Sequence, residues 1–131
     1  MTDYVKQGKA NRRKGAAFEL AVRKHLMNRG WIVDKWTNNI KDDRCVPAKS
    51  NRFKMRTMGF PDFIAYKCRG SNYDGRLYDI KFIECKVGKY LDKEEKAKAQ
   101  WYLKNNYCSC FYVAFLNKDK EIEFKKIKLD C

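Results

Sequence analysis

Two short stretches decide the fold: Gly59-Phe60-Pro61-Asp62, which opens one apolar run, and Glu84-Cys85-Lys86, which ends another. Side chains two residues apart on a strand point to the same face, so Glu84 and Lys86 are expected to project together, with Cys85 turned away. A neighbouring strand that starts at Asp62 would bring its carboxylate close to Glu84. The two stretches therefore predict adjacent strands whose ends hold two carboxylates and an ammonium.

The rest of the chain predicts an α/β order around these strands. Helical spacing favours a first helix from about Arg12 to Asn28, after a loose basic arm over residues 1–11, and a second helix over 93–105 with Asp92 as its N-cap. Apolar or alternating runs are expected to form strands at 31–36, 62–66, 77–87, 111–116 and 121–125. The order α-β-β-β-α-β-β and the length of 131 residues predict one domain with a mixed central sheet of about five strands flanked by helices.

Residues 37–60 show no clear period and are expected to form a long basic loop. A structureless connection of this length is uncommon unless it is functional, and its cations favour a loop that grips nucleic acid over a merely solvated one. We expect the DNA contacts to be Arg12, Arg13, Lys14, Arg44, Lys49, Arg52, Lys54 and Arg56.

Composition points to a polyanionic partner. The chain has 30 Lys and Arg against 16 Asp and Glu, a formal charge of +14, and such an excess attracts phosphate backbones. The alternative is a basic protein that is merely soluble. The hydrophobic share of 44% argues against a disordered basic tail.

No run has the length of a membrane span and the N-terminus lacks an apolar signal core, so an intracellular, cytoplasmic protein is expected, in the host cytoplasm if the source is a virus.

Histidine and cysteine usage narrows the chemistry. The only histidine, His25, falls on the apolar face of the first helix and is expected to be a core residue. Cys108-Ser109-Cys110 lacks the spacing of a structural zinc site. A nuclease built on this chain would therefore hold its metal through carboxylates.

The acid–lysine trio supplies that chemistry. Asp62, Glu84 and the backbone carbonyl of Cys85 can hold Mg²⁺, which prefers oxygen ligands, while Lys86 orients a water or stabilises the charge that develops on the phosphate. The alternative is a solvated strand face. Because Ile83 and Cys85 make the opposite face apolar too, either a bulge swaps the faces or one face opens on a cleft.

Pro61-Asp62 followed by Glu84-Cys85-Lys86 resembles the signature of the PD-(D/E)xK nuclease superfamily. The helical stretch from Gly15 to Glu19 resembles the Gly-x-x-x-Glu opening of archaeal-type Holliday junction resolvases, and the compact virus-type replication-repair nucleases of the superfamily match as well. The resemblance implies a restriction-endonuclease-like core and DNA cleavage that depends on Mg²⁺, with Mn²⁺ able to substitute. It implies Asp62 and Glu84 as metal ligands, Lys86 as the catalytic lysine, Glu19 as a further metal-linked acid and Gln100 as a catalytic glutamine.

The expected function is thus a metal-dependent endonuclease for branched DNA, a Holliday junction resolvase. Because a resolvase cuts two strands symmetrically, a homodimer is expected, with an interface around Trp101, Tyr102 and the last strands. Trp36, Phe53, Phe60 and Tyr90 flank basic residues and are candidates to stack on unpaired bases. The alternatives are a restriction-type, flap or single-strand nuclease of the same superfamily and, from another class, a non-catalytic basic module that binds nucleic acid.

Overall fold

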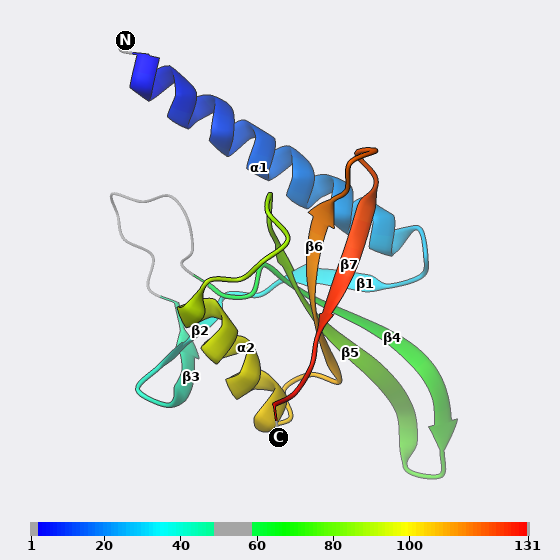
Figure 1. The fold of residues 1–131 in the computed structure, drawn as a ribbon. Coiled ribbons are helices and arrows are strands. Elements are labelled where there is room, and N and C mark those ends of the chain that lie inside the picture. The colour runs from blue at the N-terminus through cyan, green and yellow to red at the C-terminus, as the bar shows by residue number, and fades with distance from the viewer. Residues whose placement is uncertain (1–2, 49–58, 131) are drawn as a thin grey trace.

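The structure, a computed structural model, describes residues 3–48 and 59–130. Within these ranges the chain forms two helices, α1 (Asp3–Met27) and α2 (Lys93–Lys104). The strands are β1 (Ile32–Lys35), β2 (Asn38–Lys41), β3 (Arg44–Pro47), β4 (Phe63–Asn72), β5 (Gly75–Cys85), β6 (Cys110–Leu116) and β7 (Ile122–Ile127) (Figure 1).

Five of these strands form a mixed sheet in the order β1-β4-β5-β6-β7. The β5–β6 pair is parallel and the other pairs are antiparallel. Parallel neighbours need a crossover, and α2 supplies it between β5 and β6. β2 and β3 form a separate hairpin beside α2 (Figure 1). The expected α/β class with a mixed sheet of about five strands and two helices is confirmed.

Both faces of the sheet are buried, which explains the pattern of β5. Ile83 packs in a cluster with Val22 and Leu26 of α1, whereas its neighbour Phe82 packs with Tyr102 of α2. The helices therefore cover opposite faces, and alternate residues of β5 enter two different cores. The β4–β5 register shifts only between Cys68 and Gly70, far from Glu84. No bulge swaps the faces at the end of β5.

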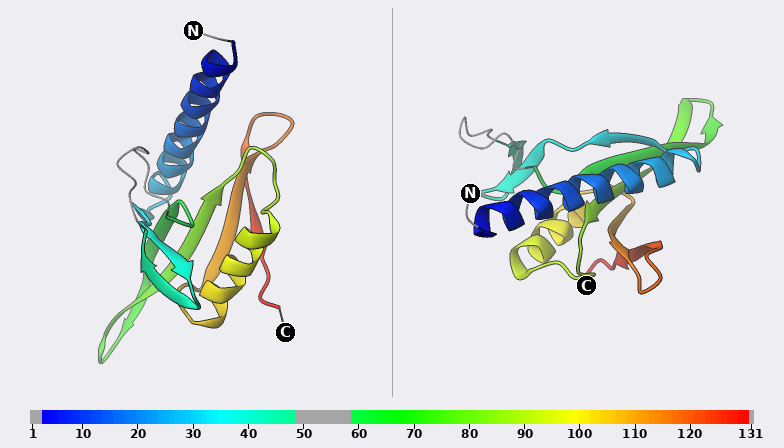
Figure 2. Two further views of the ribbon diagram at one scale, coloured as in Figure 1. Left: turned by 90° about the vertical axis from the view of Figure 1, so that its left-hand side faces the viewer. Right: turned by 90° about the horizontal axis from the view of Figure 1, so that it is seen from above.

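The N-terminal prediction was wrong: residues 3–11 are not a loose arm but the first turns of α1. The segment lacks proline and contains the good helix formers Lys6, Gln7, Lys9 and Ala10. Figure 2 shows this part of α1 projecting beyond the sheet. No helix of the described part of the chain is long and apolar enough to cross a membrane.

The expectation of a structureless loop over 37–60 was also wrong where the structure describes it. Residues 38–47 form the β2–β3 hairpin, with Asp42 and Asp43 at φ 52° and 58° in its turn. Two consecutive positive φ values are typical of the tight turns that join antiparallel strands, and Asp tolerates them. The strands expected at 62–66 and 77–87 are likewise longer than expected, because their pairing extends to Asn72 and Gly75. Residues 49–58 lie outside the described residues.

Candidate active site

Asp62 and Glu84 lie opposite each other where the β4–β5 ladder ends. The last printed pair of the antiparallel register is Phe63 with Ile83, so Asp62, one residue earlier, faces Glu84. The Asp62 N–H donates to Glu84 Oε1 at 3.1 Å, and the Cys85 N–H donates to Asp62 Oδ2 at 2.8 Å. The two carboxyl groups thus continue the ladder with side-chain bonds, and each fixes the other's backbone.

The segment before Asp62 is held from three sides. A Cβ on Gly59 would lie 2.6 Å from the backbone oxygen of Trp36, so only glycine fits there. The Trp36 N–H donates to the Asp62 carbonyl at 3.1 Å. The hydroxyl of Tyr102 on α2 donates to the Phe60 carbonyl at 2.7 Å and accepts from Trp36 Nε1 at 3.1 Å. These contacts place the Asp62 backbone against both the sheet and α2.

Lys86 bridges the acid pair and the start of α2. Its Nζ lies 3.8 Å from Glu84 Oε2 and 2.6 Å from Glu95 Oε2. Glu95 is the third residue of α2 and forms a capping box with Asp92. Glu95 was not among the predicted site residues. The capping-box spacing was the available signal, because it places a carboxylate at the helix end that follows Lys86.

Burial sets the electrostatics of the site. Glu84 is only 8% exposed. Burial first, and then the charge and hydrogen bond of Asp62, raise the pKa of Glu84 far above its ordinary value, although Lys86 opposes the shift. Burial lowers the pKa of Lys86, but the bond to Glu95 and the charges of Glu95 and Glu84 outweigh it, so the net shift is upward. At neutral pH and without metal, Glu84 holds a proton and Lys86 is an ammonium.

The acid pair fits a small, hard divalent cation. Asp62 Oδ1 and Glu84 Oε2 take no part in the two backbone bonds, and a cation beside them would replace the proton that Glu84 otherwise holds. Mg²⁺ is usually bound by one or two carboxylates and keeps several waters. Among the described residues no group of three or more His, Cys, Asp or Glu side chains is placed to hold a metal. The side-chain donor set is therefore this pair.

The other two predicted site residues differ in their relation to the pair. Glu19 is half-buried on α1, and after burial and Asp62 its charge contributes to raising the pKa of the Cys85 thiol. Cys85 directly follows Glu84 and packs against the core on the α1 side, so the negative charge of Glu19 acts next to the acid pair. The structure does not bring Gln100 to the acids: its side chain donates to the Lys128 carbonyl at 2.7 Å and accepts from the Asp130 N–H at 2.9 Å.

Most aromatic candidates belong to the core. Phe60 and Tyr102 are buried, and Trp36 packs on Phe82 with ring centroids 4.6 Å apart. Phe60 therefore offers no open face for bases, and that expectation was wrong, whereas Trp36 is half-buried and its role stays a prediction. Tyr102 is buried and cannot itself face a dimer partner, while the rest of the expected interface, Trp101 and the last strands, stays a prediction. Tyr90 is 65% exposed and stays available. Phe53 lies outside the described residues.

Only some of the basic residues predicted to contact DNA lie in the described part of the chain. Arg13 and Lys14 are exposed on α1, and Arg44 is exposed on β3. The side chain of Arg12 and the residues Lys49, Arg52, Lys54 and Arg56 lie outside the part that the structure describes. His25 is half-buried, with its ring centroid 5.5 Å from that of Phe124, and burial lowers its pKa. It lies on the α1 side of the sheet, away from Glu84.

The described site thus combines two carboxylates as paired oxygen donors, an adjacent ammonium and a third carboxylate, Glu95, that fixes this ammonium. Such an arrangement can bind a divalent cation and stabilise negative charge beside it. Comparison with protein-family models, with curated proteins and with solved structures finds no match for this chain.

Proposed function

We propose that this protein is a metal-dependent endonuclease that hydrolyses phosphodiester bonds in DNA. One observation carries the proposal: Asp62 and Glu84 meet at the ends of neighbouring strands, with Lys86 Nζ 3.8 Å from Glu84 Oε2. The net charge of +14 supports a polyanionic substrate.

Each residue has a distinct part in this proposal. Asp62 and Glu84, with the Cys85 carbonyl, hold the metal. Bound Mg²⁺ supplies Lewis-acid polarisation of the phosphate and a more acidic water. Lys86 stabilises the negative charge that grows on the phosphate oxygens, and its raised pKa favours this electrostatic role over that of a general base. Glu95 positions the Lys86 ammonium.

The topology supports a restriction-endonuclease-like core of the PD-(D/E)xK type. β1, β4 and β5 form an antiparallel meander, and α2 then crosses to the parallel strand β6. The acids stand at the start of β4 and the end of β5, as the resemblance in Pro61-Asp62 and Glu84-Cys85-Lys86 implies. Branched DNA is the proposed substrate, a four-way junction cut by a homodimer in the manner of a resolvase.

A second candidate is a non-catalytic module that binds nucleic acid, and one observation favours it. Each member of the trio already has a protein partner: Asp62 has the Cys85 N–H, Glu84 has the Asp62 N–H and Lys86 has Glu95. Such bonds can simply brace the ends of two strands. Binding of DNA without cleavage would follow.

A cleavage panel separates the two candidates. The wild type and Asp62→Asn are incubated with labelled four-way junction, duplex, flap and single-stranded DNA in Mg²⁺, in Mn²⁺ and in EDTA. The nuclease proposal expects metal-dependent cuts by the wild type only, with binding retained by the variant. Binding without cleavage in either metal would establish the module instead, and cleavage of duplex in preference to the junction would remove the resolvase assignment.

A further inference from the structure

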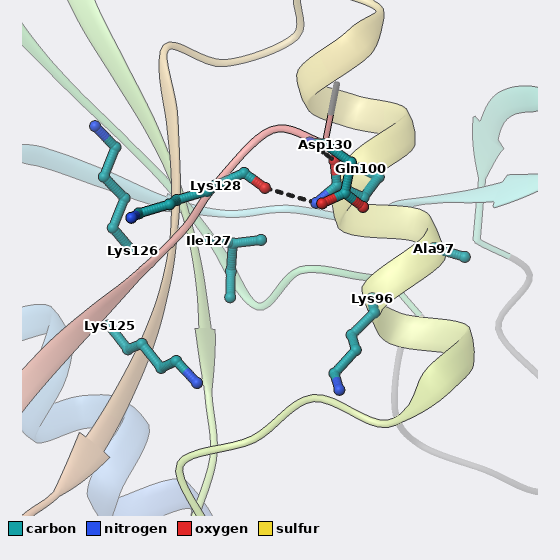
Figure 3. Close-up of a pocket in the computed structure, with 8 residues that line it drawn as sticks. All are labelled: Lys96, Ala97, Gln100, Lys125, Lys126, Ile127, Lys128 and Asp130. Carbon is teal, nitrogen blue, oxygen red and sulfur yellow. Dashed lines mark hydrogen bonds between the residues drawn. The ribbon is translucent and has the colours of Figure 1, made fainter.

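A lysine-lined groove of about 490 Å³ runs between α2 and β7. Lys96 of α2 and Lys125 of β7 extend toward each other across it, and Ile127 lies between the strand and the helix (Figure 3). No carboxylate of residues 3–48 or 59–130 forms an ion pair with either lysine. The groove therefore presents two cations that the described protein does not neutralise.

The sheet register connects this groove to the acid site. Glu84 pairs with Val113 on β6, and Val113 pairs with Lys125 on β7, so the three residues form one row. Neighbouring strands lie about 4.8 Å apart, which puts the Lys125 backbone about 10 Å from that of Glu84 on the same face of the sheet. On the other wall, Lys96 directly follows Glu95, the partner of Lys86. A DNA strand bound in the groove would therefore continue into the acid site.

Tyr90 adds an aromatic surface at the same place. It lies in the segment between Lys86 and α2 and is 65% exposed. Lys125 Nζ lies 4.4 Å from its ring centroid and Lys89 Nζ lies 5.8 Å from it. An exposed ring beside cations is the combination that binds single strands, because any base can stack on the ring while the cations neutralise its phosphates.

We propose that Tyr90, Lys96 and Lys125 bind an unpaired DNA strand beside the acid site, with a base on Tyr90 and phosphates on the two lysines. This inference rests on the proposed function for its direction and deepens it. Within branched DNA, the substrate class narrows to branches with unpaired bases next to the cut, in place of a four-way junction whose arms are fully paired. Binding of the strand does not itself require cleavage.

The first test measures binding in EDTA by fluorescence anisotropy. Labelled oligodeoxythymidine and a duplex of the same length are titrated with the wild type, Tyr90→Ala and Tyr90→Phe. Loss of base stacking should weaken single-strand binding by Tyr90→Ala about ten-fold, with less than about two-fold change for duplex. Tyr90→Phe keeps the ring and should bind as the wild type does. Equal weakening for both DNAs, or none, would overturn the stacking role.

The second test concerns the lysines. The double variant Lys96→Gln/Lys125→Gln should lower the salt dependence of single-strand binding, with a change in log–log slope of about 1.4 for two lost phosphate contacts. Arg69→Gln/Arg76→Gln removes the same charge from the β4–β5 hairpin, which projects away from α2 (Figure 1), and should leave the slope unchanged. Equal effects of the two pairs would show a dispersed electrostatic attraction and no groove.

The binding tests can fail or succeed independently of the test for DNA cleavage. Binding that depends on Tyr90 in a protein that never cuts DNA would keep the groove and reject the nuclease. Metal-dependent cleavage with binding and substrate preference unaffected by Tyr90→Ala would keep the nuclease and reject the groove.

Discussion

Replacing Tyr102 with phenylalanine removes one hydroxyl group that joins three parts of the structure. The side chain is fully buried on α2, and its hydroxyl donates to the Phe60 carbonyl at 2.7 Å while it accepts from Trp36 Nε1 at 3.1 Å. The aromatic ring remains in Tyr102→Phe, so packing on Phe82 is kept. The substitution therefore tests the hydrogen bonds of this hydroxyl, with the Phe60 carbonyl, with Trp36 Nε1 and with the Cys45 side chain.

The expected cost follows from what the lost hydroxyl leaves behind. Phe60 is 6% exposed, so its carbonyl loses a partner in a buried place, which costs about 1–3 kcal/mol. Trp36 is half-buried and can recover a water, so its bond contributes about 0.5–1.5 kcal/mol. The sum is about 1.5–4.5 kcal/mol. At roughly 3 °C per kcal/mol for a chain of this size, Tm should fall by about 5–14 °C.

Thermal and urea unfolding of Tyr102→Phe measure this cost directly. Tyr107→Phe is the matched control, because Tyr107 is 38% exposed and packs on the Tyr102 ring at 5.6 Å; its change should stay within about 0.5 kcal/mol. Phe60 lies two residues before Asp62, so loss of its hydrogen bond should also displace Asp62. DNA cleavage by Tyr102→Phe should therefore be slower than that of the wild type even at temperatures at which the variant stays folded. A stability loss no larger than that of the control would refute the reasoning that this hydroxyl positions the segment.

Three further predictions concern the site itself. Gly59→Ala should destabilise the protein by about 1–3 kcal/mol, because the new methyl group meets the Trp36 carbonyl; an unchanged Tm would contradict the close approach. In EDTA, Glu84→Gln should become more stable relative to the wild type as pH rises. The pKa of Glu84 is raised in the folded state, so the protonated Glu84 contributes its full stability below about pH 4.5, the ordinary value. The wild type loses that contribution at higher pH, whereas the glutamine does not titrate. A pH-independent difference in unfolding free energy would reject the buried, protonated acid. Mg²⁺ should raise the Tm of the wild type, because binding adds about 1.4 kcal/mol to the free energy of unfolding for each tenfold excess over Kd, and it should leave the Tm of Asp62→Asn unchanged; equal shifts in both proteins would place the metal elsewhere.

The sequence predicted the acid–lysine trio because strand periodicity and register act over a few residues. Asp62 and Glu84 had only to begin and end neighbouring strands to meet, and antiparallel pairing does this. The order of β5, α2 and β6 along the chain was likewise predicted, and α2 forms the crossover between these two strands. What periodicity left open was the face of β5, because both faces are apolar. That question depends on where α1 and α2 pack, which is a tertiary property.

Other features required information that single positions do not hold. Gln100 was placed at the site by resemblance, yet its amide meets the backbone of Lys128 and Asp130, a contact set by the path of the C-terminal segment. The Asp42-Asp43 turn was overlooked because the flanking β2 and β3 are only four residues long and alternate poorly. The contact between Glu95 and Lys86 depends on how the segment after β5 folds back, which no spacing along the sequence specifies.

Single-turnover cleavage by Lys86→Met tests whether the trio of Asp62, Glu84 and Lys86 cleaves DNA. The matched control is Lys98→Met, since Lys98 also pairs with a glutamate, Glu94 at 3.3 Å, but lies outside the trio. With labelled branched DNA, saturating protein and Mg²⁺, the account predicts that Lys86→Met binds DNA as the wild type does and cuts it at least about 100-fold more slowly, while Lys98→Met cuts normally. Cleavage by Lys86→Met at the rate of the control, or no metal-dependent cleavage by the wild type, would contradict the account.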